Sequence, residues 1–173
     1  MKYVVTLISF FLFSTTNAQK MNDKDLQKRI AEIEDRIAIK NVVDTFSILA
    51  DTKEVEKQLL LFTENATVES VMQGQVGNAL TGRKQIGDAF AGFLKNFETV
   101  YHINGQQTLT LNGDRASGIS YCLVTLIGTA SGKRIKTTMG VYYHDEFVKE
   151  NNRWLIAKRK STFAWQERTE MGQ

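Results

Sequence analysis

The stretch of residues 99–166 constrains the fold of this chain more than any other part of the sequence. It contains four long runs rich in Thr, Val, Ile, Tyr and Leu, which are typical of β-strands. Antiparallel strands of this length twist and coil, so the sheet that they form is expected to curve. Turn signals separate the runs at Asn112-Gly113-Asp114, Ala130-Ser131-Gly132 and Glu150-Asn151-Asn152.

The first half of the chain contains helices that can cover one face of this sheet. Leu26, Ile30, Ile33 and Ile37 recur at helical spacing, and apolar residues continue to Ala50 on a slightly rotated face. This pattern predicts one long amphipathic helix whose apolar stripe covers the sheet. A short second helix is expected after Asp51, because Glu54 follows at the spacing of a capping box.

A strand is predicted over 66–72 and a third helix over 83–96. Helices followed by strands indicate an α+β domain. We therefore expect one domain over 19–173, with a strongly curved, mainly antiparallel sheet and three helices packed on its concave side.

The first 18 residues have the pattern of a signal peptide. Lys2 precedes an apolar run over 3–13, and a small, polar segment ends at Ala18, where cleavage is expected. The run is short for a membrane span. We expect an exported protein, periplasmic or secreted, with no stable membrane span after cleavage; an uncleaved anchor is the alternative.

Composition argues against several classes of partner. The net charge of +3 is too small to favour nucleic acid, and the cluster Lys158-Arg159-Lys160 is interpreted as a solvated strand face. Cys122 is the only cysteine, so no intramolecular disulfide can form. The two histidines and this cysteine lack the spacing of a metal site, so we expect no metal and no other cofactor.

Three segments of the chain carry a family resemblance: residues 37–66, residues 102–116 and residues 140–159 together with Trp165. In these segments the chain resembles the SnoaL-like branch of the nuclear transport factor 2 superfamily. The resemblance implies a cone-like α+β fold with a deep, mostly apolar pocket between the helices and the concave sheet. Members include dehydratases such as the scytalone and bile-acid dehydratase relatives, isomerases, polyketide cyclases and proteins with no known reaction.

His102 and Asp51 are the first candidates for catalysis. His102 lies in the first long run among apolar and aromatic neighbours, and imidazole titrates near neutral pH. The resemblance implies that this histidine is a general base and that Asp51 faces it, where a carboxylate would orient the imidazole. Two alternatives stay open: Asp51 only caps the second helix, and His102 only forms hydrogen bonds within the sheet.

Further candidates complete the expected pocket. Dehydratases of this family use tyrosines to hold the substrate carbonyl or to donate a proton, yet this chain has Phe46 and Ser70 at the nearby positions. A tyrosine with this function would have to be Tyr101 or Tyr121. Tyr121 is taken as a catalytic candidate, with ordinary strand packing as the alternative. The expected substrate-binding residues are Phe46, Leu49, Phe90, Tyr101 and Ser70.

The sequence thus predicts a small lyase or isomerase that acts on a small apolar carbonyl compound by His-assisted proton abstraction. The alternative is a non-catalytic protein that binds a small hydrophobic molecule. We also expect a homodimer through the outer face of the sheet, including parts of 121–127 and 137–143. Apolar surface of that extent would otherwise be exposed to water.

Overall fold

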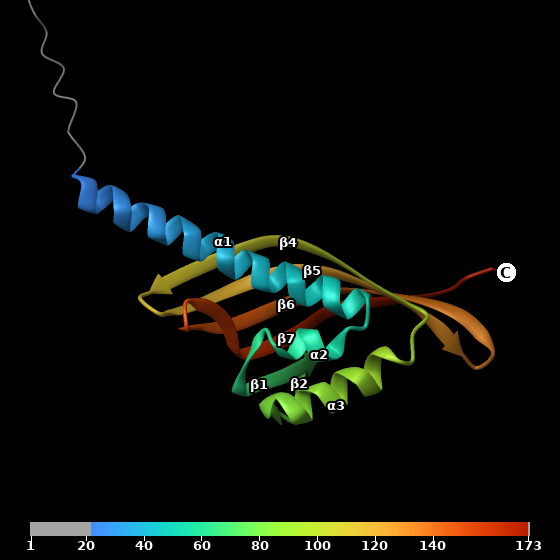
Figure 1. Ribbon diagram of the computed structural model, residues 1–173. Helices are drawn as coiled ribbons and strands as arrows, with labels where there is room; N and C mark the ends of the chain where they lie inside the picture. Colours follow the sequence, from blue (N-terminus) through green and yellow to red (C-terminus); the bar gives the residue numbers. More distant parts are fainter. Residues whose placement is uncertain (1–21, 173) are drawn as a thin grey trace, which may run out of the picture.

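The computed structural model describes residues 22–172, and the expected signal peptide lies outside the described residues. In this part of the chain, three helices lie against one side of a single curved sheet, which confirms the predicted α+β fold (Figure 1). No helix within these residues is long and apolar enough to cross a membrane. The helices are α1 (Asp23–Asp51), α2 (Val55–Leu59) and α3 (Gly82–Leu94). The strands are β1 (Phe62–Met72), β2 (Gln75–Val76), β3 (Leu80–Thr81), β4 (Thr99–Asn112), β5 (Arg115–Ala130), β6 (Lys133–Glu150) and β7 (Arg153–Glu170).

The four long strands form the antiparallel meander that the turn signals predict. The strand order is β2-β1-β7-β6-β5-β4, with β3 pairing with β1 beside this path. Ser131 and Gly132 both have positive φ, as do Asn151 and Asn152. Two successive residues with positive φ are what a tight type I′ hairpin requires. β1 joins β7 as a parallel strand and begins at Phe62, earlier than predicted.

The packing of α1 differs from the expectation. The later part of the helix is buried, with Ile39 and Val43 fully inaccessible. The apolar stripe at the start of the helix is exposed instead, and Figure 1 shows this part of α1 projecting past the sheet. The cause is the rotation of the apolar face: at 100° per residue, the early stripe lies roughly opposite the later one.

Contact between α1 and the sheet begins near Asp35. Its carboxylate oxygen Oδ1 accepts hydrogen bonds from Lys149 Nζ at 2.7 Å and Trp154 Nε1 at 2.8 Å. One residue later, Arg36 Nη1 donates to the carbonyl oxygen of Leu109 at 3.0 Å. These bonds attach the middle of the helix to β4, β6 and β7.

The buried apolar residues form two clusters. The first joins α1, α2 and α3 to β1 and the far ends of β6 and β7, around Phe62 and Phe147. The second joins the end of α3 to β4, β5 and β6, around Val124 and Val141. Much of the second cluster surrounds a cavity rather than filling the space completely.

Candidate active site

A cavity of about 270 Å³ lies between the helices and the concave side of the sheet. Its wall is mostly apolar, with Phe46 from α1, Phe90 from α3 and Val124 from β5. The polar residues in the wall are Gln58, Ser70, His102, Tyr143, Arg159 and Ser161. An apolar cavity with a few convergent polar groups is the usual form of a small-molecule site.

Asp51 and His102 form the expected pair. His102 Nδ1 lies 2.6 Å from Asp51 Oδ1, and the backbone N–H of His102 donates to Asp51 Oδ2 at 3.2 Å. The side chain of His102 is only 8% exposed, and that of Asp51 is 22% exposed. An ionised carboxylate only accepts hydrogen bonds, so Nδ1 carries the proton and Nε2 keeps a lone pair.

The structure also decides between the two interpretations of Asp51. Asp51 is the last residue of α1, and α2 begins at Val55 after Glu54, whose side chain makes no capping bond. Both carboxylate oxygens of Asp51 instead bond to His102. The hypothesis that Asp51 caps the second helix is therefore wrong, and its carboxylate is bonded to His102 instead.

Burial lowers the pKa of His102 below its ordinary value. The hydrogen bond that His102 donates to Asp51 and the negative charge of Asp51 raise this pKa, but they do not offset the burial, and the positive charge of Arg159 lowers the pKa further. The imidazole is consequently neutral at neutral pH. A neutral imidazole with a lone pair on Nε2 can accept a proton.

Arg159 is a site residue that the sequence analysis missed. Its guanidinium forms a bidentate salt bridge with Asp145, in which Nε donates to Oδ1 at 2.8 Å and Nη2 donates to Oδ2 at 2.7 Å. Each of these side chains is 1% exposed. The guanidinium carbon lies 4.1 Å from the ring centre of Phe46 and 4.3 Å from that of Tyr143, a cation–π arrangement on both rings.

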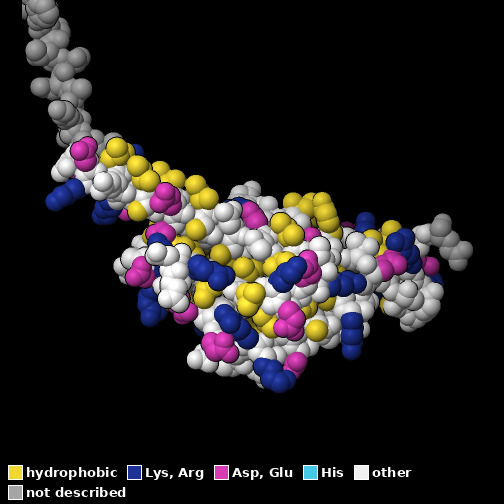
Figure 2. Space-filling view, viewed as in Figure 1, with side chains coloured by type: hydrophobic (Ala, Val, Ile, Leu, Met, Phe, Trp, Pro, Cys, Tyr) yellow, Lys and Arg dark blue, Asp and Glu magenta, His cyan; other side chains and the backbone are white. Residues whose placement is uncertain are grey.

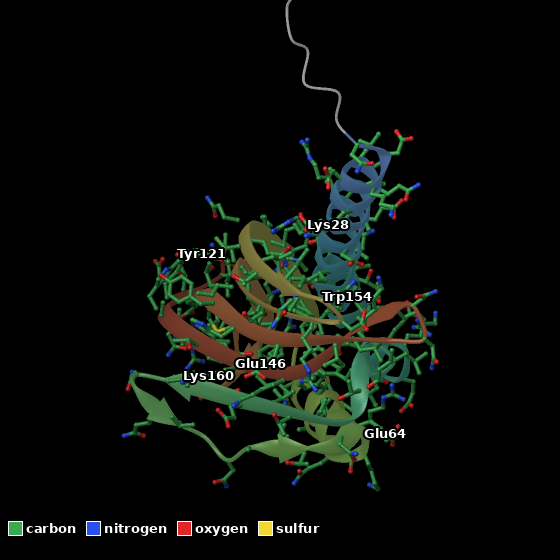
Figure 3. The ribbon with its side chains drawn as sticks, turned by 90° about the vertical axis from the view of Figure 1, so that its left-hand side faces the viewer. Lys28, Glu64, Tyr121, Glu146, Trp154 and Lys160 are labelled. Atoms are coloured by element: carbon green, nitrogen blue, oxygen red, sulfur yellow. The ribbon has the colours of Figure 1, made fainter. Side chains whose placement is uncertain are left out.

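This placement corrects the interpretation of Lys158-Arg159-Lys160 as one solvated face. Lys158 and Lys160 border a groove on the outer side of the sheet together with Glu146, and Lys160 and Glu146 are labelled in Figure 3. Arg159, in contrast, is buried and lines the cavity. Strand alternation requires this division, because successive side chains leave a strand on opposite faces. Asp145 is the register partner of Arg159 on β6, so a long-range pairing supplies the counter-charge.

Two buried polar atoms in the described chain have no hydrogen-bond partner, and both residues line the cavity. They are Arg159 Nη1, a donor, and Gln58 Oε1, an acceptor. The amide nitrogen of Gln58 is held by the carbonyl oxygen of Phe46 at 3.0 Å. A buried polar atom without a partner costs about 1–3 kcal/mol, and here an unpaired donor and an unpaired acceptor belong to two residues of the cavity wall.

Three of the predicted substrate-binding residues line the cavity, namely Phe46, Phe90 and Ser70. Leu49 does not, and the next residue of α1, Ala50, lies in the wall instead. A shift of one residue turns a helical side chain by 100°, which explains this difference.

The two predicted tyrosines lie on the wrong side of the sheet. Tyr101 is 55% exposed and Tyr121 is 47% exposed, and neither lines the cavity. Tyr121 lies at the outer edge of the molecule in Figure 3. Their strand neighbours His102 and Cys122 point inward instead. We therefore withdraw the catalytic assignment of Tyr121 and the binding assignment of Tyr101. The tyrosine in the cavity wall is Tyr143.

Burial keeps the other acidic side chains near the site, Cys122 and Tyr143, in their protonated forms. Burial raises the pKa of the Cys122 thiol to about 11, so the thiol stays protonated and is a poor nucleophile. Burial also raises the pKa of the Tyr143 hydroxyl. Among residues 22–172, no group of three or more His, Cys, Asp or Glu side chains is placed to hold a metal ion.

A curved sheet with helices packed over an apolar cavity defines the class of cone-shaped folds called NTF2-like, and here His102, bonded to Asp51, lies in the cavity wall. The sequence model of the SnoaL-like domain matches residues 31–160, which is most of the chain. The protein therefore belongs to the SnoaL-like domain family, as the resemblance implied.

Solved structures with this fold come from several bacteria. A protein from Kribbella flavida has a TM-score of 0.71 and 20% identity, over 79% of this chain and 95% of that one. A candidate scytalone dehydratase from Novosphingobium aromaticivorans has a TM-score of 0.68 and 20% identity, over 82% and 91%. The hexachlorocyclohexane dehydrochlorinase LinA-type3 from Novosphingobium barchaimii has a TM-score of 0.69 and 14% identity, over 83% and 94%.

A relative known by sequence is an uncharacterized protein of Mycobacterium tuberculosis strain H37Rv. It is 25% identical over 138 residues, which cover 80% of this chain and 91% of the relative. At these levels of identity the structural similarities establish the fold. The reaction has to be argued from the site itself.

Proposed function

We propose that this protein is a small lyase or isomerase in which His102 removes a proton from a carbon atom beside a carbonyl group. The observation that carries the proposal is the bond from His102, a residue of the apolar cavity wall, to Asp51. Membership in the SnoaL-like family and a fold shared with dehydratase-type proteins support a lyase or isomerase.

In the proposed step, the C–H bond breaks and the proton moves to Nε2 of His102. The electron pair moves onto the carbonyl oxygen and forms an enolate. Asp51 stabilises the imidazolium, and Arg159 Nη1 is a fixed donor in the same wall for an oxygen that becomes negative. The charge of the guanidinium is already balanced by Asp145, so the donor is preorganised.

The enolate then has two possible fates. In a dehydration, it expels the hydroxyl group from the next carbon, and this group takes the proton from His102 and leaves as water. In an isomerisation, His102 returns the proton to a different carbon and the double bond moves. Both fates return His102 to its neutral form, as turnover requires.

The test begins with a panel of small apolar ketones and β-hydroxy ketones, screened by thermal shift. Each compound that binds is then incubated in D2O, and exchange of the protons beside the carbonyl is followed by NMR. The wild type should catalyse exchange, and His102→Gln should lose about 100-fold or more of this rate. His144→Gln is the matched control, because His144 lies on the outer face and borders no part of the cavity.

Non-catalytic binding of a small hydrophobic molecule is the second candidate function. It is favoured by Phe46 and Ala50, which line the cavity beside Asp51 and offer no phenol hydroxyl there. The exchange experiment separates the two functions. Compounds that stabilise the wild type while their protons exchange no faster than in buffer would support the binding protein and contradict the enzyme.

A further inference from the structure

The start of α1 is a helical rod with no sheet beneath it. All residues from 23 to 34 are exposed, although the helix is continuous with the buried part (Figure 1). An isolated helix of this length is marginal in water, so a lasting rod needs packing on its apolar side. Its apolar side chains form the row of hydrophobic groups along the projecting helix in Figure 2. They are Leu26 at 42% exposure, Ile30 at 45%, Ile33 at 55% and Ile37 at 56%.

The spacing of this stripe is that of a coiled coil. The steps from Leu26 to Ile37 are four, three and four residues, which place Leu26 and Ile33 at d and Ile30 and Ile37 at a of the heptad. The next core positions are Lys40 and Asp44, which bond to each other at 2.6 Å. The seam therefore ends where α1 reaches the body of the protein.

The stripe is also placed where a second helix can reach it. The α1 residues that face the sheet, such as Ile39 and Val43, lie roughly opposite the stripe around the helix axis. A second helix packed on the stripe would therefore lie on the side of α1 that faces away from the sheet, where the sheet does not obstruct it. Two copies related by a twofold axis along the seam would keep their bodies on opposite sides.

The charges beside the seam select the parallel orientation. With Ile30 at a, Arg29 takes a g position and Glu34 the following e position. In a parallel pair, each Arg29 faces Glu34 of the other copy. An antiparallel pair would bring the g positions together and place Arg29 near Arg36 of the other copy, which is repulsive.

We propose that two copies of this chain associate through a parallel two-stranded coiled coil formed by residues 26–37 of α1. This interface is separate from the outer face of the sheet and from the cavity. The Asp–His site of each copy remains complete without it, so the inference does not depend on the proposed reaction.

The first test traps the interface in the full chain by oxidation. In a parallel pair the two a positions of one layer meet, so Ile30→Cys should form a disulfide-linked dimer in high yield. Glu32→Cys is the control, because position c faces away from the seam, and it should cross-link far less. The native Cys122 is buried and is common to both variants. Equal cross-linking of the two variants would overturn the parallel seam.

The second test measures mass by sedimentation. Ile33→Gln together with Ile37→Gln keeps good helix formers and removes two core layers from each helix, so the dissociation constant should rise about 100-fold or more. Glu34→Arg should weaken association, and adding Arg29→Glu should restore it. Tyr121→Lys, on the outer face of the sheet, should leave the Ile30→Cys cross-link unchanged. An unaltered mass in the isoleucine variant would overturn the proposal. So would a wild type whose stripe binds anionic vesicles but forms no dimer.

Discussion

Both faces of the strands β4 to β7 carry charged side chains, and the two faces differ in how these charges are held. On the concave face, the side chains of Asp145 and Arg159 are each 1% exposed and bond to each other between the neighbouring strands β6 and β7. On the convex face, the next residues along the chain, Glu146 and Lys160, border an open groove (Figure 3). A buried charge must be paired, whereas a solvated charge need not be, so only the concave face fixes its polar groups in one geometry.

This difference predicts a large contrast between two adjacent substitutions. Asp145→Asn removes the counter-charge of a buried guanidinium and should lower the free energy of unfolding by about 3–5 kcal/mol. Glu146→Gln makes the same chemical change on the exposed side and should stay within about 0.5 kcal/mol. Urea unfolding of both variants measures the contrast. If the two variants lose similar amounts of unfolding free energy, then the buried charge pair on the concave face is no more important for stability than the exposed charges on the convex face.

The Asp–His pair gives a contrast between activity and stability. Asp51→Asn removes the charge that supports the imidazolium, and its amide can donate to Nδ1 and so move the ring proton to Nε2. Proton exchange on a bound ketone should fall by about 100-fold. Folding should be nearly unaffected, because the side chain is 22% exposed and caps no helix. Asp88→Asn, in an exposed ion pair on α3, is the control and should leave exchange unchanged.

The pH dependence follows from the lowered pKa of His102. Because the neutral imidazole is the base, kcat/KM should fall on the acid side with an apparent pKa below about 6.5, the ordinary value. Asp51→Asn should move this limb to still lower pH, since the carboxylate raises the pKa. An acid limb at or above the ordinary histidine value would contradict the assignment of His102.

The lowered pKa of His102 also affects the stability of the fold. The folded protein favours the neutral imidazole, whereas unfolding favours the protonated form. Unfolded His102 binds a proton as the pH falls through about 6.5, while the folded residue resists it. The contribution of His102 to stability should therefore be complete above this pH and decrease below it. Comparing the pH dependence of urea unfolding in wild type and His102→Gln isolates this contribution, because the substitution removes the titrating group.

The smallest effect on folding is expected on the convex face. Leu123 is 38% exposed, so Leu123→Lys should change the free energy of unfolding by no more than about 0.5 kcal/mol. Val124, its buried neighbour in the cavity wall, should not tolerate the same change.

We still predict that the convex face supports a homodimer, and Leu123→Lys should lower the molecular mass measured by light scattering. If the chain that carries only Ile33→Gln and Ile37→Gln, with Leu123 intact, shows no association, that prediction is refuted.

The sequence alone was sufficient for the order of the three helices and the long strands, the three hairpin turns and the family, but not for the short strands β2 and β3. These features depend on short-range signals, such as two residues with positive φ at a turn or β-branched residues in a long run, or on the family resemblance. The approach of Asp51 to His102 was inferred from that resemblance, and the structure contains the contact.

Only the tertiary structure decided which side of each element meets the cavity. Strand alternation separates Tyr121 from Cys122 and Lys160 from Arg159, but it does not say which member of each pair points inward. That choice depends on partners far away in the chain: Asp145 balances Arg159 from the neighbouring strand, and α1 turns its apolar face partway along its length. Tyr143, rather than Tyr121, therefore lines the cavity, because burial is set by the whole packed sheet and not by any one strand.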